Sequence, residues 1–112
     1  MDKVYSLLGL AKKAGQLLSG DETCERTIKS GKAVLVIIAK DASENTKDKF
    51  KSMSKFYSVS YREYGQKVEL GKYSGKDIRS VVCILSNDFK NGLLKLIDNP
   101  INESGGEGFG KS

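Results

Sequence analysis

The stretch "AVLVIIA", residues 33–39, decides the fold. Every residue in it is apolar, and four of the seven are β-branched. A continuous run of this kind predicts a strand that is covered on both faces, in the middle of a sheet. It is also the longest apolar run in the chain and far too short to cross a bilayer, so we expect no membrane association.

Helical and strand patterns alternate on both sides of this run. The expected helices cover about 2–15, 21–30, 41–53, 66–75 and 87–97, and the expected strands cover 16–19, 33–39, 57–61 and 79–86. Asp2 is a candidate N-cap of the first helix, and Gly31 is the expected stop of the second. Such alternation predicts the α/β class, as a three-layer α/β/α sandwich with a central mixed sheet of about four strands.

Two helix starts carry the spacing of a capping box, Ser19 with Glu22 and Asp41 with Glu44. An acid near the positive end of a helix is also favoured by the macrodipole. A second interpretation of the first start is that Gly20 lets a ligand approach the helix end, because glycine has no Cβ. Both interpretations stay open.

The chain of 112 residues has room for one domain, which we place at residues 1–98. Residues 99–112 have four glycines in their last eight positions and little to bury, so they predict a flexible Gly-rich tail. The start of the chain lacks the pattern of a signal peptide, and we expect a cytoplasmic protein.

Residue types argue against most catalytic and metal chemistry. There is no histidine, and Cys24 and Cys83 lack the spacing of a metal or redox motif. No partnered base accompanies a serine, and the carboxylate pairs stand where capping explains them. We therefore expect neither an enzyme nor a bound metal or cofactor.

Charge points toward polyanions. Nineteen Lys and Arg residues against fourteen Asp and Glu residues give a net charge of +5. Some of the cations surround the second helix, among them Arg26, Lys29 and Lys32. Lys29 and Lys32 are candidates for contacts with the phosphates of a nucleic acid.

Three stretches, "LGLAKKAGQLLSG" (8–20), "IKSGKAVLVIIAKDASENT" (28–46) and "VELGKYSGKDIRSVVCI" (68–84), carry a resemblance to a known family. The chain resembles the kink-turn-binding ribosomal proteins of the L7Ae/L30e superfamily, in their small bacterial YlxQ-like branch. The resemblance covers roughly residues 3–97. It implies an α/β/α sandwich that binds sharply bent, structured RNA, such as ribosomal RNA, without catalysis. We expect a monomer.

The resemblance also implies a binding segment at the second helix. The family pattern is glycine, any residue, Asn or Lys, Glu or Gln, any two residues, and Lys. Gly20 matches the glycine and Arg26 keeps the final cation, while Glu22 and Thr23 differ from the family residues. A slip of one residue would instead let Glu22 serve as the family acid.

A second family contact comes from the loop before the last strand, here "GKDIRS" (75–80). In the family this loop stacks on an extruded nucleotide. Ile78 could cover that base, with Lys76 and Arg79 near phosphates, or Ile78 could be the first core residue of the following strand. Asp41 occupies another family contact position, where capping is an equal explanation.

The predicted function is non-catalytic binding of structured RNA, at a kink-turn or a related bent motif of ribosomal or other non-coding RNA. One alternative is a protein-interaction module on the same fold with a weakened RNA surface. Another is a remnant substrate-recognition domain of an RNA-modifying enzyme.

Overall fold

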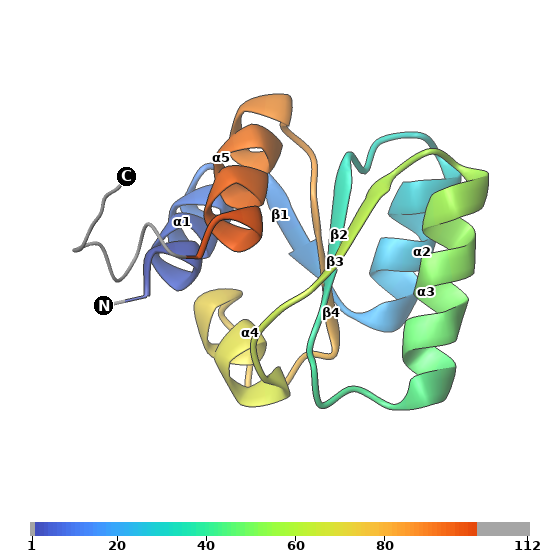
Figure 1. The fold of residues 1–112 in the computed structure, drawn as a ribbon, viewed down its shortest axis with the longest axis horizontal. Helices are drawn as coiled ribbons and strands as arrows, with labels where there is room; N and C mark the ends of the chain where they lie inside the picture. Colours follow the sequence, from blue (N-terminus) through green and yellow to red (C-terminus); the bar gives the residue numbers. More distant parts are fainter. Residues whose placement is uncertain (1, 101–112) are drawn as a thin grey trace.

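Helices and strands alternate along the whole of the described chain, residues 2–100 of the computed structural model (Figure 1). In chain order the elements are α1 Lys3–Lys13, β1 Leu17–Ser19, α2 Asp21–Lys29, β2 Leu35–Ile38, α3 Glu44–Phe56, β3 Ser60–Glu63, α4 Lys67–Tyr73, β4 Val81–Ile84 and α5 Asn87–Asp98. The order is the one that the sequence predicts. Apart from residues 99 and 100, the predicted Gly-rich tail lies outside the described residues.

The four strands form one mixed sheet in the order β1-β4-β2-β3. β2 runs parallel to β3 and antiparallel to β4, and β4 runs antiparallel to β1. Every residue of β2 and β4 is buried. The predicted mixed sheet of four strands is confirmed, and the apolar run at 33–39 supplies one of its two central strands.

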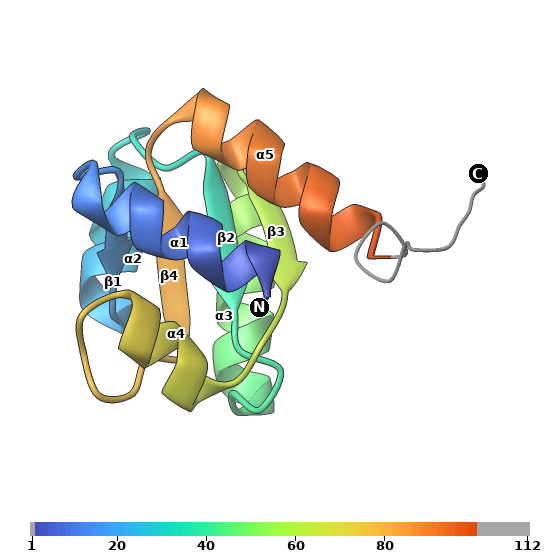
Figure 2. The same cartoon turned by 90° about the vertical axis from the view of Figure 1, so that its left-hand side faces the viewer.

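Helices cover both faces of the sheet. α2 and α3 lie on one face, and α1, α4 and α5 lie on the other, where they face the viewer in Figure 2. Phe50 of α3 and Ile28 of α2 are fully buried on the first side, and Leu8 of α1 and Leu93 of α5 are buried on the second. Each such side chain contributes about 1.5–3 kcal/mol by leaving water. The three-layer sandwich is therefore confirmed.

The third helix and the strand after it are displaced toward the C-terminus from their predicted positions, 41–53 and 57–61. α3 continues to Phe56 and ends in a tight turn in which the Val59 amide donates to the Ser54 carbonyl at 2.8 Å. Ser58 takes the left-handed conformation, with φ of 59°, that this turn requires. The strand can begin only after the turn, at Ser60.

Within residues 2–100, none of the helices has both the length and the apolar character needed to span a lipid bilayer.

The N-terminus is attached to the sandwich through Asp2. Its Oδ1 accepts a hydrogen bond from the Tyr5 amide at 3.0 Å, which confirms the predicted N-cap. Its Oδ2 accepts a hydrogen bond from the hydroxyl of Tyr64, the residue directly after β3, at 2.6 Å. One carboxylate therefore begins α1 and also joins it to a distant segment.

Asp2→Ala should lower the free energy of unfolding by about 1–2 kcal/mol, because it removes both the cap and the bond to Tyr64. Urea denaturation measures the change. Asp88→Ala is the matched control, since Asp88 lies in the first turn of α5 but Ser86 caps that helix. It should cost only about 0.3–1 kcal/mol through the helix dipole. Equal losses in the two variants would contradict the double role of Asp2.

Candidate nucleic-acid interface

Three segments that are far apart in sequence meet at one end of the sheet. Because β1 and β2 both run antiparallel to β4, their C-terminal ends lie beside the start of β4. The start of α2, the residue Asp41 after β2, and the loop at 74–80 before β4 therefore share one end, the lower end in Figure 1. We call these three segments the Gly20 end.

Gly20 is the N-cap of α2, with φ of 101° and ψ of 149°. Side chains with a Cβ are strongly disfavoured in this region, so the backbone itself requires glycine here. The Gly20 amide donates to the Val81 carbonyl at 3.0 Å, which fixes the turn against β4. Gly20 has no side chain with which to cap α2. Its first amides are thus available to an anion or to an acceptor on a ligand.

The capping box predicted for Ser19 and Glu22 is wrong. Ser19 is the last residue of β1 and pairs with Val82, so its side chain belongs to the strand and does not reach the helix amides. Its Oγ accepts a hydrogen bond from Arg79 Nε at 3.2 Å. Glu22 is exposed on the first turn of α2. Strand pairing has therefore replaced local capping at this helix start.

Arg79 connects the loop to the start of α2. Besides its bond to Ser19, its guanidinium donates to the Ile78 carbonyl at 2.8 Å. A Cβ built on Gly20 would lie 3.8 Å from Arg79 Nε, in ordinary contact with it. The two segments that the resemblance associates with RNA are therefore neighbours in the structure.

Ile78 lies outside the core. Its side chain is 53% exposed, and β4 begins only at Val81, so the interpretation of Ile78 as the first core residue of that strand is wrong. The neighbouring Lys76 is also exposed. The Gly20 end thus presents an apolar side chain beside two cations, Lys76 and Arg79.

The loop owes its position to a close approach to α4. The amide of Lys76 donates to the Gly71 carbonyl at 2.7 Å, and the amide of Arg79 donates to the Lys67 carbonyl at 3.1 Å. A Cβ on Gly71 would lie 2.5 Å from the Asp77 carbonyl oxygen. The buried Ser74 hydroxyl donates to the Gly71 carbonyl at 3.1 Å. The loop is therefore held by backbone contacts that only glycine permits.

Asp41 lies at the same end but caps a different helix from the one predicted. Its Oδ1 accepts from the Lys67 amide at 2.8 Å, at the first residue of α4. α3 begins at Glu44 with Ser43 as its cap, and the Ser43 hydroxyl accepts from the Thr46 amide at 3.2 Å. The predicted capping box of Asp41 and Glu44 is wrong. Asp41 follows β2 at a point beside the start of α4, so it caps that helix, while Ser43 caps α3.

Comparison with known proteins shows which family this chain belongs to. Residues 2–94 match the family described as Ribosomal protein L7Ae/L30e/S12e/Gadd45. The chain belongs to this family. It is 35% identical over 94 residues to the RNA-binding protein YlxQ of Bacillus subtilis (strain 168), covering 84% of this chain and 94% of that protein. It is 40% identical over 96 residues to the RNA-binding protein YlxQ of Enterococcus faecium, covering 86% and 92%.

A solved structure has the same L7Ae-type fold. A Bacillus halodurans C protein of unknown function superposes with a TM-score of 0.84 at 36% identity, covering 88% of this chain and 99% of that chain. The resemblance to the YlxQ-like branch is therefore confirmed over most of the chain.

The remaining L7Ae-type pattern residues follow α2 away from the Gly20 end. Glu22 and Arg26 are exposed one helical turn apart, and Thr23 is half-buried between them. Arg26 and Thr23 line a shallow depression of about 680 Å³ whose other lining residues include Leu18, Lys29 and Lys32. The pattern residues thus form a strip that begins at Gly20 and continues along one side of the helix.

Lys29 and Lys32 do not join the Gly20 end. Lys29 is the last residue of α2, about 12 Å along the helix axis from Asp21 at 1.5 Å per residue, and Lys32 lies in the turn after it. Glu25 contacts Lys49 Nζ at 2.8 Å and Lys29 Nζ at 2.9 Å. These two hydrogen bonds, Lys49 first, lower the pKa of Glu25 to about 2, and the bond to Glu25 raises the pKa of Lys29. One carboxylate therefore offsets part of the cation charge on this side.

Two residues that organise the site were missed in the sequence. Gly71 stands inside a helical pattern, where an isolated glycine signals a close packing contact. Ser19 was assigned to a cap when its partner is Arg79, a residue 60 positions away. No local pattern could reveal that contact, because it depends on the pairing of β1 with β4.

Gly71→Ala should lower the free energy of unfolding by about 1–3 kcal/mol, because the loop backbone at Asp77 must move to admit a methyl group. Urea denaturation measures this loss. Gly9→Ala in α1 is the matched control, since its Cβ would lie 3.8 Å from the nearest atom of Tyr73. It should stabilise the protein by up to about 1 kcal/mol through helix propensity. A stabilising Gly71→Ala would mean that the loop is not held by this contact.

Proposed function

We propose that this chain is a non-catalytic protein that binds structured RNA, at a kink-turn or a related bent motif, through the Gly20 end. Membership of the L7Ae/L30e family and similarity to two proteins named RNA-binding support the proposal. The observation that carries it is the 3.2 Å hydrogen bond from Arg79 to Ser19, which holds the loop against the start of α2. Both family contact segments can then reach one RNA at once.

The groups of the Gly20 end, and Arg26 further along α2, have chemical tasks that suit a bent RNA. Gly20 leaves room for a base edge to approach the uncapped amides of α2. Arg26 can donate both arms of its guanidinium to O6 and N7 of a guanine. Exposed Ile78 can cover an extruded base, while Lys76 and Arg79 face phosphates. The RNA is recognised by its irregular shape more than by its sequence.

Glu22 is the residue least expected next to phosphates. Because Glu22 does not cap the helix, its carboxylate can accept a hydrogen bond from the N2 amino group of a guanine. That role corresponds to the family acid under a shift of one residue; without the shift, Glu22 occupies the Asn or Lys place of the family pattern and its negative charge weakens RNA binding. Thr23 is too short and too buried to take that role.

The same proposal includes how the protein operates. The domain predicted at residues 1–98 acts as a cytoplasmic monomer without a cofactor, and its ligand is ribosomal or another non-coding RNA. Asp41 contributes by holding the start of α4, and through it the loop, at the Gly20 end.

The proposal is tested by titrating the protein with a kink-turn RNA and with a control in which the sheared G·A pairs are replaced by Watson–Crick pairs. The kink-turn should bind more tightly at every salt concentration, because added salt weakens the phosphate contacts of both complexes to a similar degree. Equal affinities would reject specific recognition and favour a protein-interaction module on this fold.

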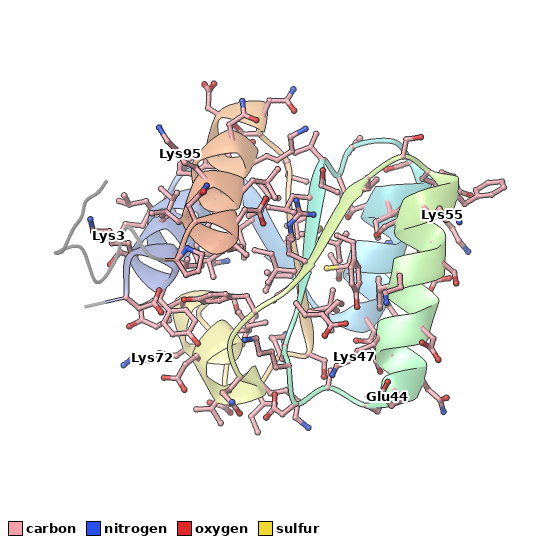
Figure 3. All side chains as sticks on the ribbon, viewed as in Figure 1. Lys3, Glu44, Lys47, Lys55, Lys72 and Lys95 are labelled. Atoms are coloured by element: carbon pink, nitrogen blue, oxygen red, sulfur yellow. The ribbon has the colours of Figure 1, made fainter. Side chains whose placement is uncertain are left out.

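Arg26→Ala should weaken binding of the kink-turn RNA by about 1–3 kcal/mol and leave the Watson–Crick control almost unchanged, because it removes a base contact. Lys95→Ala on α5, in the opposite layer (Figure 3), is the control for loss of one positive charge. If both variants lose the same affinity for both RNAs, Arg26 acts only through its charge.

The double substitution Glu22→Asn and Thr23→Glu restores the family residues. It should tighten kink-turn binding by about tenfold, the value of one good base contact. Stability should change by no more than about 0.5 kcal/mol, because neither residue caps α2. Weaker binding would instead identify Glu22 itself as the acid that reads the guanine.

A further inference from the structure

Two exposed aromatic residues end α3, at the opposite end of its helical layer from the Gly20 end. Phe56 is 80% exposed and Tyr57 is 39% exposed. Their rings meet edge to face, with centroids 4.9 Å apart and planes at 74°. The pair therefore offers aromatic surface to a partner and buries little of it within the protein.

Two lysines, Lys29 at the end of α2 and Lys55 in the last turn of α3, lie at the same end of the helical layer as this pair. Lys55 precedes Phe56 on α3 and marks the end of the helix opposite to Glu44 and Lys47 (Figure 3). Lys29, the last residue of α2, is joined to α3 through Glu25, which contacts Lys29 Nζ at 2.9 Å and Lys49 Nζ at 2.8 Å.

Sheet pairing brings a third lysine to the same end. β2 and β3 are parallel, with Leu35 opposite Ser60. The turn that carries Lys32 before β2 and the turn that follows Tyr57 before β3 therefore lie at the same end of the sheet. We call Lys29, Lys32, Lys55, Phe56 and Tyr57 the far-end patch.

The aromatic pair stands on a rigid turn. Tyr57 donates its amide to the Met53 carbonyl at 3.0 Å, and Ser58 and Val59 donate to Lys55 and Ser54 at 3.4 and 2.8 Å. These bonds close the helix end and satisfy its last carbonyls. Little backbone entropy remains to be lost when a ligand stacks on the rings, which favours binding.

Exposed aromatic faces among lysines suit one type of partner. Lysine ammonium groups attract phosphates. Aromatic rings stack on unpaired bases, and each such stacking contact contributes about 1–3 kcal/mol to the binding free energy. Glu25 is the acid in contact with Lys29, and its carboxylate also serves Lys49. An acidic partner with flat apolar groups therefore fits the patch better than a neutral apolar one.

We propose that the far-end patch is a second RNA contact, which binds an unpaired segment of the same RNA that the Gly20 end holds. Bases stack on Phe56 and Tyr57, and the phosphates between them lie against Lys29, Lys32 and Lys55. The inference rests on the proposed function for the RNA held at the Gly20 end. Lys29 lies about 12 Å along α2 from Asp21, and the aromatic pair stands at the end of the neighbouring α3, so an unpaired tail of several nucleotides reaches from one contact to the other.

The test uses three RNAs: a kink-turn alone, the same kink-turn with an unpaired run of about eight adenosines on its 5′ or 3′ end, and the oligoadenosine by itself. One of the two tails should tighten binding to the wild-type protein by about tenfold or more. Phe56→Ser should remove most of that gain and leave the affinity for the bare kink-turn unchanged. Because Phe56 is largely exposed, the melting temperature of the Phe56→Ser variant should stay close to that of the wild type.

Leu10→Ser is the matched control, because Leu10 is 56% exposed on α1 in the opposite layer. It should leave all affinities unchanged. Glu25→Gln, which removes the carboxylate paired with Lys29 and Lys49, should tighten oligoadenosine binding severalfold. The proposal is supported if Phe56→Ser and Glu25→Gln change the RNA affinities in these directions and Leu10→Ser does not.

Absence of any gain from either tail, or equal losses in Phe56→Ser and Leu10→Ser, would overturn it and leave the aromatic pair as a surface for a protein partner. A different result would separate the two proposals. If the kink-turn binds no better than its control while oligoadenosine still binds and Phe56→Ser weakens it, the far-end patch stands as an RNA contact and the Gly20 end does not.

Discussion

The structure depends on the burial of two neighbouring antiparallel strands, β2 and β4, between two layers of helices. Every residue of both strands is shielded from water, and the strands hold each other in register from Leu35 opposite Ile84 to Ile38 opposite Val81. Apolar burial of this extent can only be satisfied by helices on both faces. The antiparallel direction of the pair also decides which chain segments become neighbours at each end of the sheet.

The geometry of the Gly20 end follows from that direction. β1 pairs with the other side of β4, so its last residue, Ser19, comes beside the loop that leads into β4. Arg79 then closes the distance with a side-chain hydrogen bond, while Gly71 allows the loop to lie directly on α4. Two glycines are needed for different reasons: Gly20 for its backbone angles, and Gly71 for the space its Cβ would occupy. The exposed side chains of this end stand on a framework that backbone contacts define.

Helix α2 has a different electrostatic character at each end. Its first turn carries Asp21 and Glu22 with no capping side chain, and its last turn carries Arg26 and Lys29. This arrangement complements the helix dipole and stabilises α2 as a helix. Glu25 draws Lys29 and Lys49 together between α2 and α3, and their hydrogen bonds keep its pKa near 2. The last turn of α2 therefore carries positive charge at the end away from Gly20, and Glu25 offsets part of it.

The sequence by itself determined the class of fold, the order of the elements and the family, because hydrophobic periodicity and local motifs depend on near neighbours along the chain. It placed the run at 33–39 in the sheet centre, Asp2 at the first N-cap and Gly20 at the start of α2. Helix starts were less predictable, because a capping pattern cannot tell which amides will be nearby after folding. Asp41 serves α4 in place of α3, and Ser19 serves Arg79 in place of α2. Only the tertiary structure decided these partners and the exposure of Ile78, since each depends on the packing of segments that are tens of positions apart in the sequence.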